Sequence, residues 1–231
     1  MLKKWEELPE NMQTDAVRPY YDILNRKKKA LAGKRLMDML VSFILTVLLF
    51  PVMLGIAWAI RAEDKGPVFY RQERITAYGK KFRIFKFRTM VTDADKKGSL
   101  ITGKNDSRIT MVGRKLRKCR LDELPQLFNI MAGDMSFVGT RPEVEKYVER
   151  YTESMRATLL LPAGVTSEAS IAFKEEDELM AHYIAEGVSE EEAYVKHILP
   201  QKMRYNLKYL KKAGIPGDIA IMIKTLLEVV K

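Results

Sequence analysis

Two acidic residues stand side by side at the start of a predicted helix, in the stretch RLDELPQLFNIM that runs from residue 120 to residue 131. Asp122 and Glu123 precede Pro125, a residue that suits the first turn of a helix. An acidic residue at a helix N-terminus is favoured by the helix dipole and can cap free N–H groups, so this position alone requires no function. The alternative is catalysis, because a carboxylate can act as a nucleophile or hold a metal ion.

The positive charge around this pair favours chemistry on phosphate. Arg and Lys bind phosphate oxygens, and the planar guanidinium of Arg does so with two parallel hydrogen bonds. A carboxylate held among cations can stay ionised and attack phosphorus, while a neighbouring carboxylate can hold a divalent cation against the phosphates. Each base taken alone could instead serve only to attract a membrane surface. The basic residues in question are Lys86, Arg88, Arg117, Lys118, Arg120 and Arg141.

The composition limits the class of protein. The 231 residues suffice for one domain, or for one domain with an anchor. A net charge of +10 predicts an anionic partner, and nucleic acid, an acidic membrane surface and phosphorylated substrates all qualify. The single cysteine, Cys119, excludes intrachain disulfides and multi-cysteine zinc sites. The two histidines, His182 and His197, have no third ligand nearby in sequence, so a histidine metal site has little support.

One apolar span is long enough to meet a membrane. Residues 39–60 carry no charge, and as a helix they would extend about 33 Å. Both flanks are basic, so positive-inside counting places both in the cytoplasm. A re-entrant helical hairpin bent at Pro51 satisfies both flanks, and we favour it over a kinked crossing or a buried core helix. The flanking bases are Arg26, Lys27, Lys28, Lys29, Lys34 and Arg35 before the span, and Arg61, Lys65, Arg71, Arg74, Lys80, Lys81 and Arg83 after it.

The remaining pattern predicts an α+β, mainly helical protein in three parts. These are a polar N-terminal extension (1–30), the re-entrant membrane helix (31–62) and a single domain (63–231) that would carry any catalysis. Alternating residues on either side of Ala77-Tyr78-Gly79 predict a small β-hairpin. Helices are expected over 109–121, over 124–132 with Gly133 as the stop, over 142–161, as an acidic pair over 174–192, and over 219–230, which lies on the membrane or on the core; loops are expected over 93–107 and 162–166.

Six motifs, in this order, give the chain a family likeness from about Lys34 to its C-terminus. They are KRLMD, GPVFYRQERI, KFRTM, LDELPQLFN, GDMSFVGTRPE and the PAGVTS loop. With them the chain resembles the monotopic bacterial phosphoglycosyl transferases, also called bacterial sugar transferases. In that family a re-entrant helix with a central proline, here Pro51, anchors the catalytic part to the cytoplasmic face of the bacterial inner membrane.

The resemblance implies an enzyme with named roles. It would transfer a phosphosugar from a UDP-sugar to polyprenyl (undecaprenyl) phosphate and release UMP, as the first membrane step of glycoconjugate assembly. Asp122 would be the nucleophile that forms a phosphosugar-aspartyl intermediate, and Glu123, with Asp122, would bind Mg²⁺. The expected partners are these two substrates and membrane phospholipid, without nucleic acid and with oligomerisation left open. The residues matched to phosphate or substrate binding are Lys86, Arg88, Arg117 and Arg141.

Departures from the family pattern concern the sugar. Thr140 replaces a usual Pro, Ala163 is an insertion in the loop, and SEASIAF replaces a Gly-Trp-Ala-Gln pattern, so the sugar is not assigned. Two other hypotheses remain. A membrane-tethered basic adaptor that binds anionic lipid or nucleic acid explains the charge and the anchor, but not the paired acids. A Mg²⁺-dependent phosphohydrolase acting on a lipid diphosphate would need no nucleotide sugar.

Overall fold

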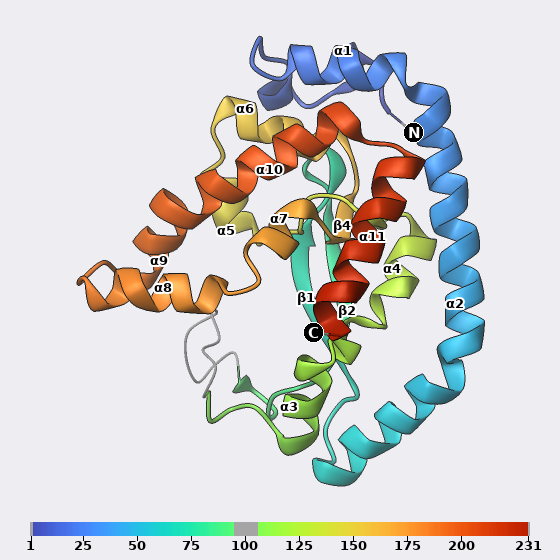
Figure 1. Ribbon diagram of the computed structural model, residues 1–231, viewed down its shortest axis with the longest axis vertical. Helices are drawn as coiled ribbons and strands as arrows, with labels where there is room; N and C mark the ends of the chain where they lie inside the picture. The colour runs from blue at the N-terminus through green and yellow to red at the C-terminus, as the bar shows by residue number, and fades with distance from the viewer. Residues whose placement is uncertain (1, 95–105, 231) are drawn as a thin grey trace.

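The predicted α+β, mainly helical fold is confirmed by the computed structural model, which describes residues 2–94 and 106–230. Figure 1 shows α2 along one side of the molecule and the other elements inside its curve. Most of the loop predicted over 93–107 lies outside the described residues. The helices are α1 Arg18–Arg26, α2 Lys28–Glu63, α3 Met111–Lys118, α4 Gln126–Ala132, α5 Glu145–Val148, α6 Glu153–Arg156, α7 Glu168–Ala172, α8 Glu176–Ala185, α9 Glu190–Glu192, α10 Leu199–Lys212 and α11 Ile215–Val230; the strands are β1 Phe69–Ile75, β2 Lys81–Phe87, β3 Met135–Val138 and β4 Ala163–Thr166.

The apolar span forms one continuous bent helix, α2, where the sequence predicts a hairpin of two arms. Pro51 lies inside α2 and lacks the N–H that would bond to the carbonyl of Val47. Losing one such bond bends a helix without ending it, because the bonds on either side persist. Figure 1 shows the result, as α2 runs down one side and then turns underneath the molecule.

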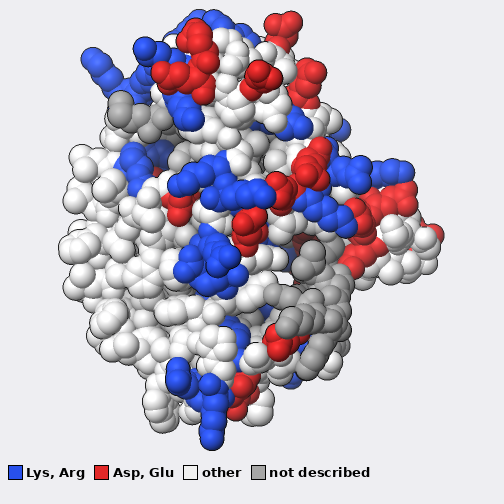
Figure 2. All heavy atoms as spheres, turned by 180° about the vertical axis from the view of Figure 1, so that it is seen from behind, with Lys and Arg blue, Asp and Glu red and all other residues white. Residues whose placement is uncertain are grey.

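The outer face of α2 is apolar and exposed. Within the described residues α2 is the one helix long and apolar enough to cross a membrane, yet only 11% of its most apolar stretch is buried. A core helix of a soluble protein would instead be mostly buried. Figure 2 shows the broad uncharged surface along this edge. The large exposed side chains are Leu36, Met39, Leu40, Phe43, Ile44, Val47, Leu48, Phe50, Val52, Leu54 and Trp58.

The N-terminal half of α2 is held by a buried charge cluster. Lys34 pairs with Asp218 of α11, and its ammonium lies 3.5 Å from the carboxylate of Asp38, one turn along α2. Asp38 in turn accepts a hydrogen bond of 2.8 Å from Ser136 of β3. All four side chains are buried. Because a buried charge without its partner is costly, this cluster fixes α2 against β3 and α11.

The C-terminal half of α2, beyond the bend, packs against the same body. Met53 and Ile60 are buried with Phe87 of β2 and Leu116 of α3. Glu63, the last residue of α2, accepts the backbone N–H groups of Met111 and Val112 at 2.7 and 3.0 Å, so it caps α3. Both halves of the apolar helix are therefore attached to one folded unit.

The predicted β-hairpin is confirmed. Strands β1 and β2 pair antiparallel, with Phe69 opposite Phe87 and Ile75 opposite Lys81. Tyr78 and Gly79 adopt positive φ angles of 60° and 74° in the connecting turn. Glycine tolerates such angles without strain, which is why a tight turn falls there.

Two predictions around residue 160 are wrong. The single helix expected over 142–161 is three short pieces, α5, α6 and a 3₁₀ turn at Ala157–Leu160. The expected loop over 162–166 contains β4, which pairs parallel with β3. A Cβ on Gly164 would lie 2.1 Å from the backbone nitrogen of Gly139, so glycine is required where the strands approach. β4 could not be predicted from the sequence, because four residues are too few to show the alternation of a strand and its partner β3 lies almost thirty residues away.

The N-terminal segment is more closely packed than a polar extension would be. Leu8, Met12, Val17 and Leu24 are buried in the main core with residues of α10. At the other end of the chain, α11 buries Ile221 and exposes four large apolar residues. One side of α11 therefore packs on the core, and the other side exposes apolar side chains. The exposed residues of α11 are Ile219, Ile223, Leu226 and Leu227.

Candidate active site

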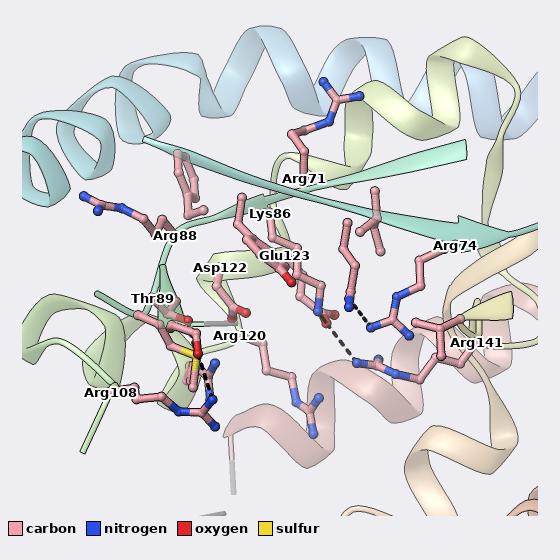
Figure 3. Close-up of a pocket in the computed structure, with 18 of the residues that line it drawn as sticks. Arg71, Arg74, Lys86, Arg88, Thr89, Arg108, Arg120, Asp122, Glu123 and Arg141 are labelled. Atoms are coloured by element: carbon pink, nitrogen blue, oxygen red, sulfur yellow. Dashed lines mark hydrogen bonds and ion pairs between the residues drawn. The ribbon is translucent and has the colours of Figure 1, made fainter. Parts of the chain in front are cut away.

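A cleft of about 760 Å³ lies between the β-hairpin and the C-terminal helices. Strands β1 and β2 form one wall, and α7, α8 and α10 contribute the opposite wall. Asp122 and Glu123 both line it, as do all four bases that the family likeness matched to the site. Figure 3 shows the acidic pair in the middle of the cleft, with basic side chains on both sides. The basic residues that line it are Arg71, Arg74, Lys86, Arg88, Arg108, Arg117, Arg120, Arg141, Lys174 and Lys202.

The acidic pair occupies a short 3₁₀ turn, Leu121–Glu123, immediately before α4. The N-cap of α4 is Pro125, and no side chain caps it. The structure thus gives the acidic pair no part in capping α4. Arg120, just before the turn, has a φ of 52°, a left-handed conformation that is uncommon for a residue with a side chain. Such local strain clusters at functional sites, where it aims side chains that an ordinary helix start would turn elsewhere.

Glu123 is held by two of the predicted phosphate ligands. Lys86 Nζ lies 2.7 Å from Glu123 Oε1, and a guanidinium nitrogen of Arg141 lies 3.5 Å from the same oxygen. Burial would raise the pKa of Glu123, but the charges of Lys86 and Arg141 outweigh it and lower the pKa to about 2. Glu123 is therefore a carboxylate anion at neutral pH.

Asp122 has a different electrostatic environment. Burial raises its pKa above the ordinary value, and the negative charge of Glu123 raises it further, while Lys86 and Arg117 oppose the shift. Two adjacent carboxyl groups thus have pKa values pushed in opposite directions. Such divergence is characteristic of paired acids with separate tasks. The more basic carboxylate, Asp122, is the better nucleophile of the two.

The other two predicted bases differ in how they are used. Arg117 of α3 lines the cleft, and its Nε donates to Thr89 Oγ1 at 2.8 Å, which leaves its terminal nitrogens for a ligand. Arg88 also lines the cleft, but its guanidinium donates to the carboxylate of Asp64 at 2.7 Å and to the backbone carbonyl of Asp64 at 2.9 Å. Arg88 therefore ties the end of β2 to the end of α2.

The wall that α8 and α10 contribute could not be predicted from the sequence. Arg74 and Glu143 belong to motifs quoted for the family likeness, so their presence in the site had a sequence signal. Glu176, Tyr194 and Lys202 had none, because they are distant in sequence from the motifs; Glu176 and Lys202 lie in α8 and α10, and Tyr194 lies in a π-helical segment, Ala193–Ile198. All five line the cleft.

The donor set fits Mg²⁺ in one specific way. The described residues hold no group of three or more His, Cys, Asp or Glu side chains that could bind a metal by themselves. Mg²⁺ is commonly held by one or two carboxylates together with substrate phosphates, and it prefers oxygen ligands. Asp122 and Glu123 supply such carboxylates inside a cleft that suits phosphate. The site therefore fits a Mg²⁺ ion shared with a substrate, not an all-protein cage.

A comparison with family models identifies the chain's relatives. The model for bacterial sugar transferases matches residues 29–231, a range that contains all but the first residue of α2 and every residue that lines the cleft. The chain belongs to the bacterial sugar transferase family. In this bacterial sugar transferase the matched segment also includes every residue that the sequence nominated for the site.

Three curated relatives of this bacterial sugar transferase carry names that specify substrates. A UDP-N-acetylgalactosamine-undecaprenyl-phosphate N-acetylgalactosaminephosphotransferase of Aeromonas hydrophila is 31% identical over 196 residues, or 84% of this chain and 42% of the relative. A UDP-glucose:undecaprenyl-phosphate glucose-1-phosphate transferase of Klebsiella pneumoniae is 40% identical over 141 residues, or 60% of this chain and 30% of the relative. A protein of the same name from Escherichia coli is 31% identical over 222 residues, or 94% of this chain and 44% of the relative. The chain spans less than half the length of each of these relatives.

Proposed function

We propose that this protein transfers a phosphosugar from a UDP-sugar to polyprenyl phosphate, with release of UMP. The observation that carries the proposal is the environment of the acidic pair. Glu123 is kept ionised by Lys86 and Arg141, while burial raises the pKa of Asp122 in the same cationic cleft. The names of the relatives, which specify UDP-sugars and undecaprenyl phosphate, support the same substrates.

The proposed reaction proceeds by two displacements at one phosphorus. A carboxylate oxygen of Asp122 attacks the phosphorus that bears the sugar; the bond from that phosphorus to the bridging oxygen breaks, and UMP leaves with the oxygen. A phosphate oxygen of the polyprenyl phosphate then attacks the same phosphorus and displaces the carboxylate of Asp122. Neither step requires a proton, because each nucleophile and each leaving group is an anion.

The surrounding side chains orient the phosphates. Lys86 and Arg141 border Glu123, and Arg117 lines the cleft from α3 with its Nε bonded to Thr89. Cations at these positions reduce the repulsion between an anionic nucleophile and an anionic diphosphate. Mg²⁺, held by Asp122 and Glu123 with the phosphates, would supply further charge neutralisation when bound.

We also propose that the protein lies on the cytoplasmic face of the bacterial inner membrane without crossing it. Both halves of α2 are attached to the same folded unit, through Lys34 and Asp38 on one side of the bend and through Met53 and Ile60 on the other. A helix that crossed a bilayer would separate its two ends by a hydrocarbon layer of about 30 Å. If α2 crossed the bilayer, the folded unit to which both of its halves are attached would have to enter the hydrocarbon layer. We therefore favour a helix that does not cross.

The experiment that tests the function is UMP release from a panel of UDP-sugars with undecaprenyl phosphate and Mg²⁺. We expect release with at least one sugar, and we expect Asp122→Asn to abolish it while the fold persists. Asp134→Asn is the matched control, because Asp134 pairs with Lys80 outside the cleft. Full activity in Asp122→Asn would refute the nucleophile, and release of inorganic phosphate without a nucleotide sugar would indicate a phosphohydrolase. No release from a folded, membrane-bound protein would favour a non-catalytic adaptor.

A further inference from the structure

The two ends of the cleft differ in chemistry. Around Asp122 the lining is dominated by Lys86, Arg117 and Arg120, which suit phosphate. Beyond Arg141 the lining includes two carboxylates, Glu143 and Glu176, and the tyrosine Tyr194. Figure 3 shows Arg141 and Arg74 together on the side of Asp122 that is opposite Arg88 and Arg108. We call the part formed by Arg74, Glu143, Glu176, Tyr194 and Lys202 the carboxylate end.

Glu143 is the central acceptor of the carboxylate end. Its side chain is only 7% exposed, yet it lines the cleft, and its Oε1 accepts a hydrogen bond of 2.5 Å from the hydroxyl of Tyr194. Burial and then the charge of Glu143 raise the pKa of Tyr194 well above its ordinary value, so the hydroxyl keeps its proton and remains the donor. Tyr147 packs against Tyr194 with ring centroids 4.6 Å apart and holds that ring in place.

The donors nearby are either engaged or, like Arg74 Nε, buried away from the cleft surface. Lys202 is buried, and its ammonium donates to Glu176 at 3.0 Å and to the hydroxyl of Tyr194 at 3.4 Å. Arg74 donates to the side-chain oxygen of Gln72 and to the backbone carbonyl of Pro142. A ligand that enters this end therefore meets fixed acceptors more than available donors. Such preorganised acceptors bind groups that carry O–H donors.

We propose that the carboxylate end holds the sugar ring of the UDP-sugar, with a sugar hydroxyl donating to Glu143. The proposal rests on the proposed function and specifies where its substrate lies. Phosphate is disfavoured here because Glu143 and Glu176 carry negative charge and because the two cations of this end, Arg74 and Lys202, are engaged by protein acceptors. A neutral polyol instead supplies O–H donors to the carboxylates. Uracil is less suited, because it presents two carbonyl acceptors and one N–H to a surface whose own donors are engaged.

The position of Arg141 bears on which way the UDP-sugar lies in the cleft. Its guanidinium lies 3.5 Å from Glu123, and Glu143 follows two residues later in the chain. A phosphate bound between Arg141 and Asp122 therefore has its sugar substituent directed either toward the carboxylate end or toward the basic end. The acceptors of the carboxylate end select the first of these orientations.

The test is a comparison of sugar selectivity in the full-length protein in detergent. The UDP-sugar that the wild type uses is compared with its mono-deoxy analogues, each lacking one hydroxyl, in UMP-release assays of Glu143→Gln and Tyr194→Phe. Glu143→Gln should lower kcat/KM about tenfold to a hundredfold for the parent sugar, because a hydrogen bond to a charged acceptor is lost. This loss in kcat/KM should be smaller for the one analogue that lacks the bound hydroxyl, because that analogue cannot make the hydrogen bond in either protein. Inhibition of Glu143→Gln by UMP should stay within about twofold of the wild type, because the proposal places the nucleoside elsewhere in the cleft.

Glu145→Gln is the matched control, because Glu145 is exposed and pairs with Lys81 outside the cleft. Tyr194→Phe should change selectivity in the same direction by a smaller factor, and it decides the matter if Glu143→Gln does not fold. An equal loss for every analogue would overturn the proposal in favour of a structural role, and a parallel weakening of UMP inhibition would overturn it in favour of a nucleoside pocket. A wild type that releases no UMP from any UDP-sugar would remove the proposed function and this inference together, whereas wild-type turnover with unaltered selectivity in both variants would remove the inference alone.

Discussion

Asn129 Oδ1 accepts the backbone N–H of Phe85 at 2.8 Å, and Asn129 Nδ2 donates to the carbonyl of Arg83 at 3.0 Å. The buried side chain thereby fixes α4, which follows the acidic pair, to β2, which carries Lys86. The ion pair between Lys86 and Glu123 joins β2 to the 3₁₀ turn that immediately precedes α4. Asn129 therefore sets the distance between the turn that carries Asp122, the proposed nucleophile, and Lys86, a proposed phosphate ligand.

We expect Asn129→Ala to reduce both stability and turnover. Removing the amide leaves the N–H of Phe85 without this partner, at a cost of about 1–3 kcal/mol, whereas the carbonyl of Arg83 still accepts from Arg71. The kcat for UMP release should fall more than KM rises, because the acidic pair shifts relative to Lys86. Thermal unfolding and steady-state kinetics measure the two effects.

Asn129→Asp is the informative second variant. It retains the oxygen that accepts from Phe85, but it places a buried carboxylate against the carbonyl of Arg83. Because an unpaired buried charge is costly, its unfolding temperature should fall at least as far as that of Asn129→Ala. Wild-type kcat in Asn129→Ala, at a temperature where the variant is folded, would contradict a positioning role.

The activity should fall in mild acid at a higher pH than an exposed aspartate would predict. Attack requires ionised Asp122, and burial raises its pKa, so a larger fraction is protonated at any given acidic pH. The positive charge of Lys86 lowers this pKa, and Lys86→Met should therefore move the acidic limb of kcat/KM to still higher pH. A pH profile of UMP release measures the shift, with Lys80→Met as the control because Lys80 is exposed and outside the cleft. Coincident acidic limbs for the wild type and Lys86→Met would refute the electrostatic coupling.

Removal of divalent cations should stop UMP release reversibly. EDTA should abolish turnover, and excess Mg²⁺ should restore it, because the acidic pair offers too few ligands to retain the ion without substrate phosphates. The unfolding temperature of the substrate-free protein should not change with EDTA, since Lys86 and Arg141 already compensate the charge of Glu123. Undiminished turnover in EDTA would exclude a metal from the mechanism.

Local patterns in the sequence predicted several of the elements that carry the site. The i, i+3, i+4 and i+7 spacing from Leu124 to Met131 predicted α4, and its stop at Gly133 is confirmed by a φ of 94°. The alternation of residues predicted β1 and β2, because the pairing of two strands joined by a short turn depends mainly on local sequence. The acidic pair and the four bases were nominated from charge and motif, and all of them line one cleft.

The rest depended on contacts between distant segments. Arg88 was nominated as a phosphate ligand, but which partner it meets depends on where α2 ends, and Asp64 lies 24 positions away. The pairing of β3 with β4 and the wall that contains Tyr194 arise in the same way. The bend of α2 is a further case, because a single proline decides between a bend and a break only through the packing on either side.

Both ends of α2 should be accessible from the same side of the membrane. Lys3 lies before the helix and Lys80 lies after it, both are exposed, and both belong to the unit to which the two halves of α2 are attached. In a Cys119→Ser background, single cysteines at Lys3→Cys and Lys80→Cys should react with a membrane-impermeant maleimide only when the cytoplasmic face is presented. The replacement of Cys119 is necessary because its thiol is exposed.

A proline substitution distinguishes the cause of this topology. Pro51→Leu should restore the missing hydrogen bond and straighten α2. A straighter α2 should strain the contacts of Met53 and Ile60 with β2 and α3. We then expect a lower unfolding temperature, with the two labelled positions still on the same side as long as the buried cluster at Lys34 persists. Labelling of Lys3→Cys and Lys80→Cys from opposite faces, in the protein that retains Pro51, would instead establish a crossing helix. It would also contradict the attachment of both halves of α2 to one folded unit, because such a unit cannot lie on both sides of a hydrocarbon layer of about 30 Å.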